Sequence, residues 1–79
     1  MPTTRYLFDI RFDDQPWSED DTEDDFDSAE RAREEAVALM AEIVADRLHT
    51  YWQISVRVRH HEPEPLLILS LSMTAQEWP

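Results

Sequence analysis

The chain has 79 residues and a formal net charge of −11, from eighteen Asp and Glu residues against seven Arg, and it contains neither Cys nor Gly. This length fits a single domain over residues 1–79 with a small core, and the lack of Cys excludes a disulfide framework and thiolate metal sites. The charge disfavours DNA, RNA and anionic lipid as direct ligands, because each repels an acidic surface, so a basic protein partner is expected.

The sequence also indicates where the protein works. Residues 1–6 lack a basic region followed by an apolar run, and no stretch reaches the ~20 apolar residues that a bilayer-spanning helix needs. With Cys absent as well, we expect a cytoplasmic protein with no membrane contact.

Three segments alternate between apolar and polar side chains, which is the pattern of strands packed on one side. They are residues 5–13, 51–60 and 66–74. Residues 61–65 contain two prolines that cannot donate to a strand ladder, so a hairpin loop is expected there, and residues 75–79 should form a tail. The apolar positions expected to face the core are Tyr6, Phe8, Ile10, Phe12, Ile54, Val56, Leu69 and Leu71.

Residues 27–49 are predicted to form one amphipathic helix. Asp27 is the expected N-cap, and Glu30 three residues later would complete a capping box. Glu34, Glu35 and Glu42 fall on the outer face. The apolar positions of the inner face are Ala29, Ala32, Ala36, Val37, Leu39, Met40, Ile43, Val44 and Leu48.

An acidic segment, residues 13–27, leads into this helix without a single basic residue. Trp17 and Ser18 are candidates for a short extra strand within it. Phe26 is the large apolar side chain expected to hold the segment against the core.

The resulting order is strand, possible short strand, helix, strand, strand, which predicts a two-layer α+β sandwich. Its three- to four-stranded sheet should be mostly antiparallel. A helix that joins two strands of one sheet usually leaves them parallel, so residues 5–13 and 51–60 are expected to run in the same direction. The sheet face away from the helix would carry Arg5, Arg11, Arg57 and Arg59. We expect a solvated face on which Asp9 and helix-side carboxylates pair with these arginines, in preference to a bound phosphate.

No motif for catalysis, a cofactor or a metal emerges, so an enzymatic role is not expected. Asp20, Thr22 and Asp24 copy the opening of a calcium loop, but Asp25 stands where that loop needs Gly and Arg31 where it needs Glu. The adjacent His60 and His61 would point to opposite sides of a strand, and the absence of Gly excludes phosphate-binding glycine loops.

The carboxylates remain as the candidate functional groups. A charge run is often only a solvated surface, whereas ten carboxylates within nineteen residues favour a site that binds a basic partner. Helical carboxylates four residues apart lie ~6 Å apart along the axis, against one phosphate per ~3.4 Å on each DNA strand, so imitation of DNA is one possibility. The candidate partner-binding residues are Asp13, Asp14, Glu19, Asp20, Asp21, Glu23, Asp24, Asp25, Asp27, Glu30, Glu34, Glu35 and Glu42.

In size, acidity and single-helix α+β layout, the chain resembles the small phage-encoded anti-CRISPR proteins that act on type I systems. This resemblance rests on no shared motif and therefore transfers no residue role. It implies an inhibitor, working in the bacterial host cell, that binds a CRISPR surveillance complex and blocks target DNA.

Three further segments carry a second likeness: Arg5-Tyr6-Leu7-Phe8, Ala29-Glu30-Arg31-Ala32-Arg33-Glu34-Glu35-Ala36 and Trp52-Gln53-Ile54-Ser55-Val56. Through them the chain is similar, over nearly its whole length, to short alphaproteobacterial domains of unknown function with a ββαββ order. It departs from them in lacking Gly in its turns.

The sequence thus favours a non-enzymatic acidic inhibitor of the anti-CRISPR type. The alternative is a protein-interaction or oligomerisation module that pairs through a free strand edge or the Arg-bearing sheet face. Both a monomer and a homodimer are compatible with the sequence.

Overall fold

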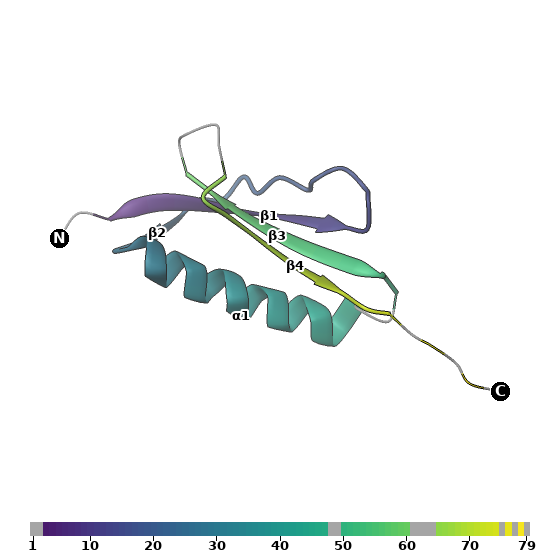
Figure 1. Ribbon diagram of the computed structural model, residues 1–79. Coiled ribbons are helices and arrows are strands. Elements are labelled where there is room, and N and C mark those ends of the chain that lie inside the picture. Colours follow the sequence, from purple (N-terminus) through teal and green to yellow (C-terminus); the bar gives the residue numbers. More distant parts are fainter. Residues whose placement is uncertain (1–2, 48–49, 61–64, 75, 77, 79) are drawn as a thin grey trace.

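The computed structural model describes residues 3–47, 50–60, 65–74, 76 and 78. One four-stranded sheet is covered on one face by one helix (Figure 1), which confirms the predicted α+β sandwich. The sheet order is β2-β1-β3-β4, and every neighbouring pair is antiparallel. The elements are β1 (Thr4–Phe12), β2 (Asp24–Phe26), α1 (Ala29–Arg47), β3 (Gln53–Arg59) and β4 (Leu67–Ser72).

The predicted parallel pairing of the first strand with the strand after the helix is wrong. β1 and β3 are antiparallel neighbours, with Phe8 opposite Val58 and Phe12 opposite Ile54. The short strand β2 is the physical reason, because it reverses the chain before α1 begins. The helix therefore connects β2 to β3, which run in the same direction on either side of β1.

The core lies between α1 and the sheet, largely as the apolar alternation predicts, although Leu71, expected in it, is 41 % exposed. Ala32 and Ala36 have no exposed surface, and their small side chains bring the helix close to β1 and β3. The buried apolar residues are Tyr6, Phe8, Ala32, Ala36, Ile54, Val56 and Val58, with Phe26, Leu39, Met40, Ile43, Leu67 and Leu69 packed partly buried around them.

The helix differs from its prediction at its start and on one side. Ser28, not Asp27, caps it, since the Ser28 Oγ accepts the Arg31 N–H at 3.2 Å. Val37, expected in the core, is 52 % exposed. The predicted helix end at residues 48–49, most of the loop at 61–65 and part of the tail at 75–79 lie outside the described residues.

The acidic segment is ordered along the edge of β1 that β3 does not use. Ser18 forms only an isolated bridge with Ile10, so the short strand expected at Trp17 and Ser18 is instead Asp24–Phe26. Phe26 holds the segment down as predicted: its ring lies 5.9 Å from that of Tyr6 and 5.8 Å from that of Phe8.

Candidate functional site

A buried ion cluster occupies the sheet face that α1 does not cover. The alternation of β1 places Asp9 on this face, and the strand register sets it opposite Arg57. Its carboxylate has no exposed surface and accepts hydrogen bonds from the Nε atoms of Arg57 at 2.8 Å and Arg59 at 2.6 Å. The sequence predicts the pairing of Arg57 and Arg59 with Asp9, but its expectation of a solvated face is wrong, because Asp9 is fully buried.

The environment of Asp9 holds it in the charged state. Burial alone raises the pKa of Asp9, but hydrogen bonds from Arg59, the Asp20 N–H and Arg57 outweigh that effect and bring the pKa below its ordinary value. The same carboxylate raises the pKa of Arg59. A charge-assisted cluster of this kind is structural, because its groups are paired with one another.

Hydrogen bonds connect the acidic segment to this cluster. The Asp20 N–H donates to the Asp9 carboxylate at 2.8 Å, and the Asp20 carboxylate in turn accepts the Phe8 N–H at 3.1 Å. Above the cluster, the Trp17 ring centre lies 4.5 Å from the guanidinium carbon of Arg57, a cation–π contact. Asp20, a candidate binding residue in the sequence, is thus engaged in holding the edge of β1.

Asp13, in the turn after β1, also accepts backbone hydrogen bonds, as Asp20 does. One of its carboxylate oxygens accepts the N–H groups of Trp52 at 2.9 Å and Gln53 at 3.1 Å. Its backbone φ of 54° lies in the left-handed region, which Asp tolerates better than most residues. The absence of Gly therefore leaves this carboxylate both to make the turn and to satisfy the start of β3.

Four further candidates form ion pairs on the surface. The distances run from a guanidinium nitrogen to a carboxylate oxygen. For Arg5 they are 3.4 Å to Glu23 and 3.6 Å to Asp25. Arg59 lies 3.9 Å from Glu19, and Arg31 lies 3.4 Å from Glu34. Exposed pairs of this kind each contribute ~0–1 kcal/mol, so they position these carboxylates weakly. They do reduce the local negative field.

The remaining seven candidates are exposed, and within the described ranges no Arg forms an ion pair with them. Asp14 lies in the turn after β1, and Glu35 and Glu42 lie along α1. Four others come before, within and after β2: Asp21 precedes the strand, Asp24 lies in it, Asp27 lies between β2 and α1, and Glu30 is in the first turn of the helix. We call this group the acidic strip: Asp21, Asp24, Asp27 and Glu30.

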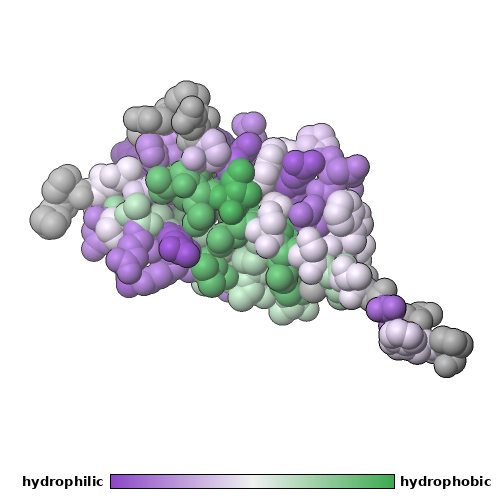
Figure 2. Space-filling model, viewed as in Figure 1, coloured by the Kyte–Doolittle hydropathy of each residue, from purple (hydrophilic) through white to green (hydrophobic). Residues whose placement is uncertain are grey.

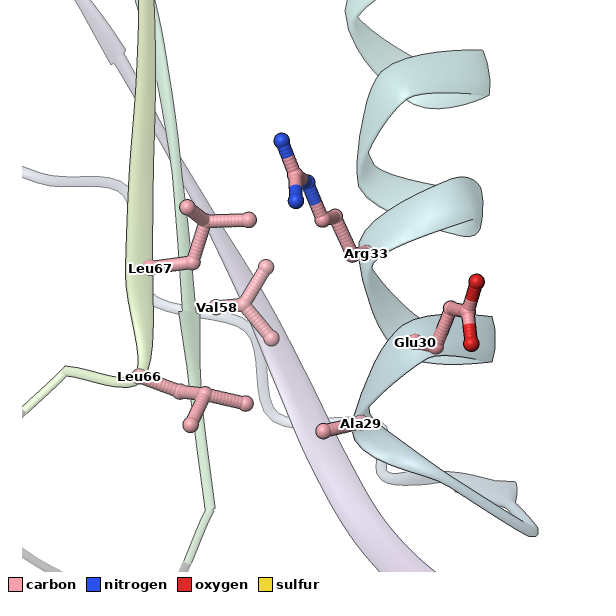
Figure 3. Close-up of a pocket in the computed structure, with 6 residues that line it drawn as sticks. All are labelled: Ala29, Glu30, Arg33, Val58, Leu66 and Leu67. Atoms are coloured by element: carbon pink, nitrogen blue, oxygen red, sulfur yellow. The ribbon is translucent and has the colours of Figure 1, made fainter.

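The structure does not bring a metal-binding group together in the part of the chain that it describes. No group of three or more His, Asp or Glu side chains there has the geometry to hold a metal ion. A hollow of about 380 Å³ between α1 and β4 is lined by Ala29, Glu30, Arg33, Val58, Leu66 and Leu67. Figure 3 shows the apolar side chains and the Arg33 side chain in the gap, while the carboxylate of Glu30 points away from the strands.

No helix among the described residues combines the length and the apolar character that crossing a lipid bilayer requires. Architecture and surface together define a small α+β domain with an acidic edge. The chain belongs to a family described as a domain of unknown function (DUF6894), whose model matches residues 5–72. No curated protein and no solved structure is significantly similar to it.

Proposed function

We propose that the protein is a non-enzymatic, cytoplasmic binding protein whose acidic strip docks onto an Arg- or Lys-rich surface of a partner protein. The observation that carries this proposal is the acidic strip itself. Its four carboxylates are exposed and form no ion pair among the described residues, whereas Asp13 and Asp20 of the same segment hold the backbone.

Order in the acidic segment supports the proposal. β2 pairs with β1 from Thr4 to Tyr6, and Phe26 packs on the core directly between Asp24 and Asp27. Carboxylates on a fixed backbone lose little conformational entropy when they bind, which favours a specific partner over diffuse attraction. Glu30 adds a fourth carboxylate in the first turn of α1.

A narrower form of the proposal concerns the partner. The basic surface would be one that normally holds nucleic acid, and the protein would exclude DNA from it, as an anti-CRISPR inhibitor excludes target DNA from a surveillance complex. The resemblance in size, acidity and layout motivates this form. A partner that releases the protein when duplex DNA is added would support it, and a partner with no affinity for nucleic acid would refute it.

Capture of partners from a bacterial lysate tests the broader proposal. Two variants carry the same change in charge: Asp21→Lys with Asp24→Lys in the acidic strip, and Glu35→Lys with Glu42→Lys on α1. The strip variant should lose the basic partners that the wild type retains at low salt, and the α1 variant should keep them. Loss of the same partners from both variants, or from neither, would contradict a role for the strip.

A further inference from the structure

The two edges of the sheet are built differently. At the first edge, β2 has three residues, two of them Asp, and the Asp20 carboxylate covers the Phe8 N–H further along β1. At the second edge, β4 reads Leu-Ile-Leu-Ser-Leu-Ser and pairs, among the described residues, with β3 alone. Charges, short strands and covering side chains are the usual protection of a sheet edge, so the first edge is protected and the second is not.

The backbone of β4 offers hydrogen-bonding groups along this unprotected edge. The Met73 N–H donates to the Trp52 carbonyl at 2.9 Å, which fixes the alternation of the antiparallel ladder. The backbone N–H and C=O groups that hydrogen-bond to β3 are therefore those of Leu67, Leu69 and Leu71. The residues whose N–H and C=O groups point outward are Ile68, Ser70 and Ser72, all of them exposed.

Apolar side chains surround the same edge. Ile68 is 49 % exposed and Leu71 41 %, and Leu66 and Met73, which flank the strand, are comparably exposed. Figure 2 shows the hydrophobic side chains gathered over β4 and over its gap with α1. Such a contiguous apolar surface, bordered by polar residues, is typical of a protein interface.

The distribution of charge indicates which strand would pair with the free edge of β4. β4 carries no charged residue, so nothing on it would recognise a basic or acidic strand, and an antiparallel edge is complementary to a second copy of itself. The sheet order separates β4 from β2 by three strand spacings, or about 14 Å. Glu30 and Arg33 are the charged side chains that line the hollow between α1 and β4, and their charges are opposite.

We infer that β4 is a homodimerisation strand: two copies pair antiparallel along it, with Ser70 opposite Ser70, into one eight-stranded sheet that carries both helices on the same face. This register uses all three outward-facing residues, because it also sets Ile68 opposite Ser72. The β2 edges then lie seven strand spacings, or about 34 Å, apart, several times the Debye length of ~8 Å. The inference is independent of the proposed function.

Sedimentation velocity of the full chain over a wide concentration range tests this inference. The wild type should sediment as a dimer of twice its 9.4 kDa chain mass. Ile68→Lys with Ser72→Lys sets Lys opposite Lys across the pairing and should weaken the dimer by roughly tenfold or more. Ala41→Lys with Ala45→Lys, on the exposed side of α1, changes the net charge equally and should leave the dimer intact.

A monomeric wild type at all concentrations would overturn the inference, and so would a dimer that survives the β4 substitutions in a folded variant. Circular dichroism establishes folding of the variant. If the Ile68→Lys with Ser72→Lys variant unfolds, cross-linking of Ser70→Cys tests the pairing instead, because the chain has no other Cys. Directly opposed residues lie ~5.5 Å apart, within disulfide reach, so mild oxidation should cross-link Ser70→Cys and not Ala41→Cys. Absence of that cross-link would also refute the pairing.

Discussion

The backbone N–H of Asp20 donates a 2.8 Å hydrogen bond to the buried carboxylate of Asp9. Two acidic residues that are eleven positions apart in the chain thus belong to one cluster, in which the arginines of β3 supply the positive charge. The order of the acidic segment, and with it the geometry of the acidic strip, depends on a carboxylate that is not itself on the acidic surface.

Asp9→Asn should be strongly destabilising. The amide keeps the size of the side chain but leaves Arg57 and Arg59 without a negative partner on a largely buried face. Removing one member of a buried ion pair costs about 3–5 kcal/mol. Urea unfolding measures this loss, with the exposed Asp14→Asn as the control, which should shift stability by less than about 0.5 kcal/mol. Equal stability of the two variants would show that the Asp9 cluster contributes little.

The same carboxylate predicts a dependence on pH. The pKa of Asp9 is lower in the folded chain than its ordinary value, so its contribution is complete above about 4 and is lost as the pH falls through the lowered pKa. The difference in unfolding free energy between the wild type and Asp9→Asn should therefore shrink on acidification below pH ~4. A difference that stays constant over that range would contradict the lowered pKa.

Two substitutions of Asp13 distinguish the contribution of its turn conformation and hydrogen bonds to stability from the contribution of its charge. Asp13→Ala removes the acceptor for Trp52 and Gln53 and puts a residue less tolerant of positive φ at 54°, so a loss of about 1–3 kcal/mol is expected. Asp13→Asn keeps an acceptor oxygen and the tolerance of this conformation, and should retain most of the stability. Thermal unfolding compares the two. If both variants lose stability equally, the charge of Asp13, and not its turn geometry, is what matters.

The sequence predicts most of the fold because hydrophobic alternation and helical periodicity are local signals. Alternation predicts strands at residues 5–13 and 51–60, and the structure has them at Thr4–Phe12 and Gln53–Arg59. The pairing of Asp9 with Arg57 and Arg59 also follows from alternation, since all three fall on the same face.

The features that the sequence does not predict depend on contacts between residues that are far apart in the chain. The segment Asp24–Phe26 has no intrinsic strand preference, and it pairs with β1 because Phe26 is buried against Tyr6 and Phe8. Without this strand, the sequence predicts the wrong direction for β3. The structural use of Asp13 and Asp20 was likewise hidden, because a hydrogen bond to a backbone N–H leaves no pattern in the sequence.

The most direct test of the acidic strip is the affinity of a labelled deca-arginine peptide for the two charge-matched variants, measured by fluorescence anisotropy at low salt. Both have the same net charge, so the general attraction for the peptide is equal and only the location of the carboxylates differs. We predict that Asp21→Lys with Asp24→Lys weakens binding roughly tenfold relative to wild type, while Glu35→Lys with Glu42→Lys weakens it severalfold less. Equal affinities of the two variants would contradict a localised acidic site.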